Sequence, residues 1–311
     1  MTRPLRPDGL PQPRSDFEAA VVDLTVDLFE AYPTWGTVAG YHLVDSRWPD
    51  LSDAGRLARL DMYHGHAERL SSFAPAELSP EEEVDRSILL EEIEKAVFGD
   101  EILRSEAWDA LQSIYLMGGG LFGVLSREYA PWSDRGAALL ARIDGLPQLT
   151  RQVLAGLTGL PQRPVAVLHL DTALSQLGGV TELVDTAVAE ATSRAAAGEA
   201  PELVAPIEAA AVEARAALEV FRAQLDTKVR ARAAGEGRLG AKLFAQKLRL
   251  TLGSDISPAQ LRERAWADYH AVRAEMLRLA RQTWPTWLPD EPLPDVADGD
   301  TKAEARLVRR V

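Results

Sequence analysis

The sequence has 311 residues with 34 basic and 47 acidic side chains, so its formal net charge at neutral pH is −13. A surface this acidic repels a phosphate backbone, which excludes a general nucleic-acid binder. The chain has no cysteine, and this excludes disulfides, thiolate catalysis and cysteine-ligated metal sites.

The N-terminal residues 1–14 hold four prolines and no apolar run, so we expect a disordered lead-in and no signal peptide. The longest stretch without a charged residue, 110–126, contains four glycines and is shorter than the roughly 20 apolar residues that span a bilayer. These features predict a cytoplasmic protein with no membrane partner and no nucleic-acid partner.

Apolar residues recur at spacings of three and four along most of the chain, a pattern typical of amphipathic helices. Two capping boxes with proline at the first helical position, Ser79-Pro-Glu-Glu82 and Ser257-Pro-Ala-Gln260, mark helix starts. Pro285 is expected to end the helix that follows Ser257. In chain order, the predicted helices span residues 15–31, 53–72, 80–98, 134–144, 147–158, 164–177, 180–197, 206–234 and 257–284.

Sustained alternation of β-branched and polar residues is nearly absent, so the sequence predicts an all-α fold. We expect an elongated bundle of antiparallel amphipathic helices over residues 15–284, with an incomplete C-terminal end. Residues 285–300, rich in proline and aspartate, predict an extended linker. The capping box Thr301-Lys-Ala-Glu304 then predicts that residues 301–311 are the start of a truncated helix.

The glycine-rich segment 114–129 predicts a loop or a broken helix, because adjacent glycines impose an entropic cost on a regular element. Aromatic and cationic side chains flank these glycines, a grouping that could line a substrate groove, although core packing is the favoured explanation of the tryptophans. The predicted groove residues are Trp108, Gly118, Gly119, Gly120, Arg127 and Tyr129.

The five histidines decide the question of a metal site. A His-Glu-x-x-His motif places two imidazoles and a general base on one helix face, but no histidine of this chain precedes a glutamate. His64 and His66 are two residues apart and would point away from each other on a helix. The sequence also has no phosphate-binding lysine after the glycines and no Gly-x-Ser-x-Gly motif. We therefore expect no catalytic residue and no metal ligand in this chain.

Several segments carry a resemblance to a known family. They include Pro33-Thr-Trp-Gly-Thr-Val-Ala-Gly-Tyr-His-Leu-Val-Asp45, then Trp48-Pro-Asp-Leu-Ser52, and much later Asp255-Ile-Ser-Pro-Ala-Gln-Leu261. In order and spacing, residues 15–285 resemble the N-terminal half of the bacterial domain of unknown function 885 family, whose members are classed with zinc metallopeptidase-like proteins.

The resemblance implies a zinc helix and a distal glutamate ligand in a C-terminal half that this chain lacks. It therefore implies a helical framework and one wall of a peptide groove, with zinc present only together with the missing half. On this interpretation the chain alone is inactive, and the complemented protein hydrolyses a peptide or related amide.

Two alternatives remain open. A standalone helical interaction protein would bind a partner helix or self-associate through exposed apolar helix faces. A metal-independent enzyme would use the segment from Gly118 to Tyr129.

Overall fold

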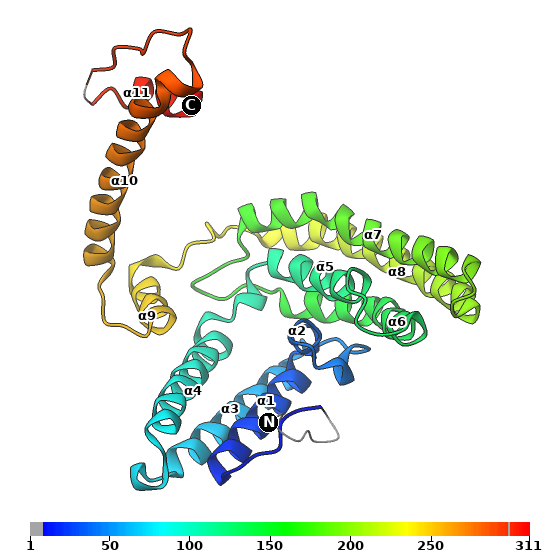
Figure 1. Cartoon of the computed structure of the whole chain (residues 1–311). Coiled ribbons are helices and arrows are strands. Elements are labelled where there is room, and N and C mark those ends of the chain that lie inside the picture. Colours follow the sequence, from blue (N-terminus) through cyan, green and yellow to red (C-terminus); the bar gives the residue numbers. More distant parts are fainter. Residues whose placement is uncertain (1–8, 298) are drawn as a thin grey trace. The chain divides into compact units, whose positions relative to one another are not determined.

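The computed structural model describes residues 9–297 and 299–311, and in these residues every regular element is a helix (Figure 1). Extended pairing is limited there to two isolated bridges. The all-α prediction is confirmed. The chain forms two compact units that divide after Leu239, inside the range 15–284 that the sequence predicts as one helical domain. No described helix is long and apolar enough to cross a membrane.

The first unit begins with a layer formed by α1 (Asp16–Ala31), α3 (Asp53–Ser72) and α4 (Pro80–Phe98). Each helix starts at a serine whose hydroxyl accepts a hydrogen bond from a backbone N–H in the first turn, as the sequence predicts for α4. Their shared core contains Phe17, Leu24, Tyr63, Leu70 and Ile93. The short α2 (Pro33–Ala39) follows α1 and has no counterpart among the predicted helices.

The larger core of the first unit lies among α5 (Leu111–Leu125), α6 (Trp132–Gly156), α7 (Val167–Ala196) and α8 (Val204–Gln224). In Figure 1, α7 and α8 run side by side as a long hairpin. Their contact buries small side chains, including Ala187 and Ala191 of α7 and Ala211 and Ala214 of α8. Helix α8 continues through a π turn, Leu225–Val229, and a 3₁₀ turn, Arg230–Arg232.

Two predicted helix breaks are wrong. Pro147 lies inside α6, which joins the predicted helices 134–144 and 147–158, because Leu146 and Leu149 around it are buried in the core. Such packing offsets the roughly 3 kcal/mol that an interior proline costs. Likewise α7 runs through Gly178 and Gly179, so the predicted helices 164–177 and 180–197 are one helix.

The glycine-rich segment is also helical, which corrects the predicted loop. Helix α5 runs without interruption through Gly118, Gly119 and Gly120. Gly120 explains why: a Cβ there would lie 2.2 Å from Cζ3 of Trp48, so the indole ring occupies the space above this backbone. Close packing against a large aromatic ring compensates for the weak helix propensity of glycine.

The second unit contains α9 (Gly240–Leu252), α10 (Pro258–Trp287) and α11 (Thr301–Arg310). The capping box at Ser257 is confirmed, but α10 ends at Trp287 and includes Pro285 in its last turns. Helix α9 has no predicted counterpart.

The predicted linker over 285–300, of which residue 298 lies outside the described residues, folds back on α10. Trp284 donates a hydrogen bond from Nε1 to the carbonyl oxygen of Glu291 at 2.9 Å, and it shares a small core with Val296 and Leu307. The cap of α11 is Asp300, whose carboxylate accepts hydrogen bonds from the N–H groups of Lys302 and Ala303. The predicted box at Thr301 is therefore wrong by one residue.

Of the predicted lead-in over residues 1–14, residues 1–8 lie outside the described residues.

Candidate functional site

A polar cluster of the first unit is built around the buried carboxylate of Asp45, just after a 3₁₀ turn, His42–Val44. One carboxylate oxygen, Oδ2, lies 3.0 Å from Nδ1 of His42 and accepts a hydrogen bond from Oη of Tyr129 at 2.5 Å. Burial, followed by the hydrogen bond to Asp45, raises the pKa of the Tyr129 phenol. The cluster thus joins the turn after α2 to the segment between α5 and α6.

Arg142 of α6 is fully buried beneath this cluster. Its Nη2 donates a hydrogen bond to Oγ1 of Thr37 at 2.6 Å, and its Nη1 donates to the carbonyl oxygen of Gly120. The guanidinium also lies over the indole of Trp48, 5.6 Å from the ring centroid. Burial lowers the pKa of Arg142 to about 10, and the Asp45 carboxylate opposes that shift. Arg142 therefore ties α2, α5 and α6 together.

The structure brings some of the predicted groove residues to this region. Tyr129 belongs to the cluster, and the exposed Arg127 donates a hydrogen bond from Nη1 to the carbonyl oxygen of Val38 at 2.9 Å. Gly120 is buried against Trp48, while the Cβ positions of Gly118 and Gly119 face open space.

Trp108 lies apart from them, before the start of α5, whereas Tyr129 follows its end. A 15-residue helix separates the two, a rise of about 20 Å at 1.5 Å per residue. The buried Trp108 donates from Nε1 to the carbonyl oxygen of Leu103 at 2.9 Å and stacks against His169. The predicted residues therefore do not line one common groove.

Sequence reasoning did not assign roles to His42 and Asp45. Both residues lie in the segment that carries the family resemblance. That resemblance was the only signal in the sequence that could have indicated their importance. The partnership of Asp45 with Tyr129 spans 84 residues, so no local pattern reveals it.

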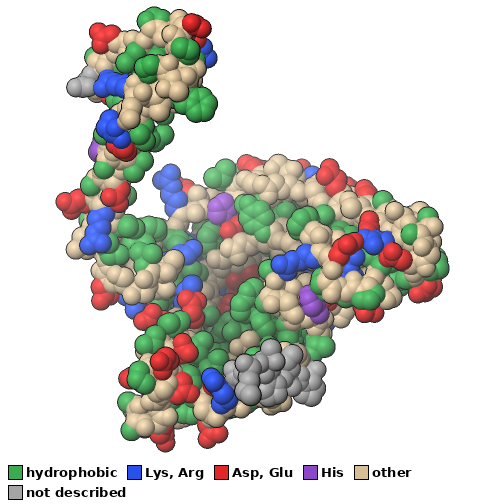
Figure 2. Space-filling model, in the orientation of Figure 1, with side chains coloured by type: hydrophobic (Ala, Val, Ile, Leu, Met, Phe, Trp, Pro, Cys, Tyr) green, Lys and Arg blue, Asp and Glu red, His purple; other side chains and the backbone are tan. Residues whose placement is uncertain are grey.

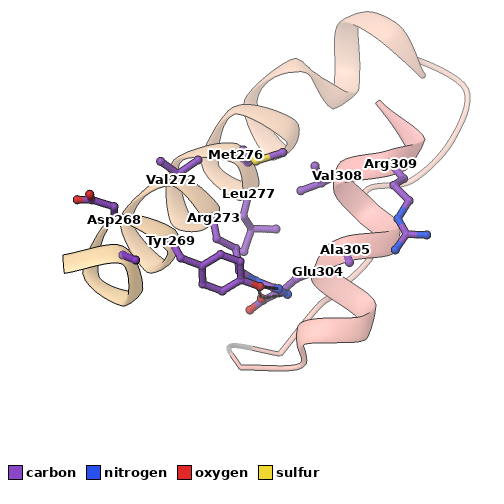
Figure 3. Close-up of a pocket in the computed structure, with 11 residues that line it drawn as sticks. Asp268, Tyr269, Val272, Arg273, Met276, Leu277, Glu304, Ala305, Val308 and Arg309 are labelled. Carbon is purple, nitrogen blue, oxygen red and sulfur yellow. Dashed lines mark hydrogen bonds and ion pairs between the residues drawn. The ribbon is translucent and has the colours of Figure 1, made fainter. Parts of the chain in front are cut away.

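The second unit contains a groove of about 510 Å³ between α10 and α11 (Figure 3). Its walls are mostly apolar, and Figure 3 shows Leu277 of α10 and Val308 of α11 pointing toward each other across it. Val272 and Met276, one helical turn apart on α10, are both about half exposed, with 59% and 49% of their surface accessible. Hydrophobic side chains also show at the surface of this unit in Figure 2.

One end of this groove is closed by polar side chains (Figure 3). Arg273 forms an ion pair with Glu304 at 2.9 Å and donates a hydrogen bond to Oη of Tyr269 at 3.0 Å. These contacts raise the pKa of Arg273 and lower that of Glu304. The ion pair of Arg273 with Glu304 joins α11 to α10.

Charge is divided unequally along the sequence. Residues 240–311 contain 12 basic and 10 acidic side chains, which leaves 22 basic and 37 acidic side chains before them. The first unit therefore carries a formal charge of −15 and the second +2. On α11 the cationic side chains of Lys302, Arg306 and Arg309 are exposed.

Among the described residues, histidine, aspartate and glutamate side chains form no group of three or more that could hold a metal ion. Histidine–carboxylate pairs do occur, as at His42 and Asp45, but a protein zinc site normally uses three or four ligands.

The comparisons with known proteins agree with the fold. The model of a family described as "Bacterial protein of unknown function (DUF885)" matches residues 33–298, so the chain belongs to the DUF885 family. No curated protein matches. Among solved structures, the chain is similar to a "putative lipoprotein of unknown function" from Shewanella oneidensis, with a TM-score of 0.74 and 21% identity. The match covers 95% of this chain and 52% of the Shewanella chain, so this protein spans about half the length of that relative.

Proposed function

We propose that this protein is a helical scaffold that binds an amphipathic helix of a second polypeptide in the groove between α10 and α11. The observation that carries the proposal is the groove itself, about 510 Å³ with mostly apolar walls. Packed helix pairs commonly present such a trough to a third helix, which inserts apolar side chains at spacings of three and four residues.

The side chains of α10 support a helical occupant. Val272 and Met276 follow each other at the i, i+4 spacing, and the exposed Tyr269 and Leu279 extend the same stripe at spacings of three. A stripe of this kind normally lies against another apolar surface, because each large side chain left in water forgoes about 1.5–3 kcal/mol of burial.

The exposed cations of α11 favour an acidic partner. Among the charged residues that line the groove, Asp268 and Glu304 balance Arg273 and Arg309. Lys302 and Arg306 are exposed elsewhere on α11 and would attract carboxylates beside the apolar stripe of the incoming helix. About half of the Shewanella chain has no counterpart in the residues of this chain, and that unmatched part is a candidate source of the helix. We propose that the occupant corresponds to that part of the fold.

Metal-dependent hydrolysis would belong to the complex. The described residues gather no metal-binding group, so a partner would have to contribute the metal ligands for such a reaction. This protein would then supply the framework and one wall of a peptide groove.

The test uses the part of the Shewanella polypeptide that this chain does not match, produced separately. We expect it to bind the full chain with a dissociation constant of about 10 μM or lower, measured by calorimetry. Val272→Glu places a charge in the groove and should weaken binding at least tenfold. Val212→Glu on α8 is the matched control, because Val212 and Val272 are equally exposed at 59%.

Absence of binding by the unmodified chain would overturn the proposal, as would equal binding by the Val272→Glu chain. If the protein alone sediments as a dimer that Val272→Glu dissociates, the groove is occupied by a second copy and the proposed partner is wrong. Turnover of an amide substrate by the isolated chain would contradict its role as a non-catalytic scaffold.

A further inference from the structure

A small cavity in the first unit lies where the start of α5 meets the end of α6. It measures about 130 Å³. Leu51, Leu116 and Val153 give it apolar walls, and Gly156 at the end of α6 leaves part of the wall without a side chain. An apolar chamber of this size fits an unbranched alkyl chain and is too small for a large aromatic ligand.

Two carboxylates border this apolar chamber, Glu106 and Asp109. Oε1 of Glu106 lies 3.4 Å from Nε of Arg104, and the Glu106 charge also helps to raise the pKa of Arg59. Oδ1 of Asp109 accepts a hydrogen bond from the N–H of Leu111 and lies 2.9 Å from Nδ1 of His169. A carboxylate can accept hydrogen bonds at both oxygens, so each group can take a further donor beside these contacts.

An irregular stretch of backbone places these carboxylates. Helix α4 ends in a π turn, Gly99–Leu103, and Arg104 then adopts a left-handed conformation with φ of 43°. This reversal leads into the 3₁₀ turn Ser105–Ala107, which carries Glu106, and the chain reaches Asp109 just before α5. Behind Asp109, the indole of Trp108 stacks on His169 and fixes the imidazole beside the carboxylate.

We propose that this cavity binds the side chain of a lysine from a peptide. Four methylene groups would contact Leu51, Leu116 and Val153, and the ammonium group would donate hydrogen bonds to Glu106 and Asp109. A cationic ligand also suits the first unit as a whole, which carries a formal charge of −15.

A neighbouring hollow supports a peptide rather than a free amine as the source. Gln152 lines both the cavity and a second, more polar hollow of about 360 Å³. The second hollow is bordered by Trp48, Asp50 and Gln148. Gln152 donates a hydrogen bond from Nε2 to Oδ1 of Asp50 at 2.8 Å and accepts one from the N–H of Leu51, which fixes both side chains at this border. The carboxamide of Gln148 can pair with the N–H and C=O groups of an extended peptide. The two hollows together would hold a lysine side chain and the main chain beside it.

The test compares two capped amino acids that differ mainly in the terminal charge. Nα-acetyl-lysine methylamide, whose side-chain ammonium group is free, should bind the full chain at least tenfold more tightly than Nα-acetyl-norleucine methylamide, measured by ligand-observed NMR. Glu106→Gln should weaken the binding of capped lysine at least fivefold. Equal affinities for the two compounds would overturn the proposal, because they would show that the carboxylates do not recognise the ligand.

A second variant fills the cavity without removing any contact of the fold. No atom lies within 4 Å of the position that a Cβ of Gly156 would take, so Gly156→Leu should abolish binding and leave the helix intact. Gly178→Leu on α7 is the matched control, because a Cβ there also meets nothing within 4 Å. Unchanged binding by Gly156→Leu would contradict the site. Binding of free n-butylamine as tight as that of capped lysine would contradict the assignment to a peptide. None of these outcomes depends on the groove of the second unit.

Discussion

The imidazole of His42 and the phenol ring of Tyr129 lie parallel, with centroids 3.7 Å apart and planes inclined by 3°. Both side chains also contact the same oxygen of Asp45. Stacking and hydrogen bonding therefore act on one pair of residues, and they join the turn after α2 to the segment that precedes α6.

Tyr129→Phe should keep the stacked ring and remove the hydrogen bond to Asp45. The loss of a hydrogen bond to a buried carboxylate costs about 1.5–3 kcal/mol, so the free energy of unfolding in urea should fall by about that amount. Tyr115→Phe is the control, because Tyr115 is 61% exposed and its substitution should change stability by less than about 0.5 kcal/mol. Equal effects of the two substitutions would mean that the Tyr129 hydroxyl contributes nothing to stability.

Adjacent glycines of α5 should respond in opposite directions to substitution by alanine. Gly119→Ala should stabilise the protein by about 0.5–1 kcal/mol, because a Cβ meets nothing within 4 Å and alanine is the better helix former. Gly120→Ala should destabilise it by about 1–3 kcal/mol, because its Cβ would lie 2.2 Å from the indole of Trp48. Thermal unfolding of the two variants checks this, and a shift of the same sign for both would contradict the packing described here.

Alkaline pH should destabilise the first unit through its buried phenols. The hydroxyls of Tyr32 and Tyr63 are 3.0 Å apart, and burial is the main cause that raises the pKa of both and of Tyr129. A raised pKa means that the folded state keeps its phenolic protons at a pH where the unfolded chain releases them. The stabilising contribution is therefore complete below about pH 10 and is lost as the pH rises through the folded-state values.

Unfolding free energies measured from pH 8 to pH 11 should fall less steeply for Tyr63→Phe than for the unmodified chain. An equal dependence on pH for the two chains would show that the pKa of Tyr63 is the same in the folded and unfolded states.

Trypsin should first cut after Arg238. This exposed residue lies next to the division between the two compact units, in a segment outside the helices. Mass spectrometry at short times should find fragments 1–238 and 239–311, and Arg238→Gln should slow their formation. An earlier cut within α7 or α8 would contradict the expectation that these buried helices open less readily than the connection.

Helix limits could be predicted where local chemistry determines them. The serine caps at Ser52 and Ser79 begin α3 and α4, and both helices have the expected bounds. The helix breaks predicted from composition at Pro147 and at the three glycines of α5 are wrong, because tertiary packing keeps both helices continuous there. The division after Leu239 depends on contacts between distant segments, which periodicity does not reveal.

The candidate sites were less accessible to sequence reasoning. Tyr129 and Trp108 were both singled out, and each proves to contact a histidine, but the two lie at opposite ends of α5. No sequence pattern indicated Glu106 and Asp109, because their common cavity forms only when α6 packs against the start of α5.

The alanine-rich contact between α7 and α8 has a practical consequence. Alanine has no side-chain rotamers to lose, so packing two helices through such residues costs no side-chain entropy. The hairpin is therefore a suitable element on which to place a spectroscopic label. Since the chain has no cysteine, a pair of cysteines introduced anywhere in it would be the only sites for thiol-reactive labels. One label on the hairpin and another on α10 would report whether the distance between the two units changes when a partner binds.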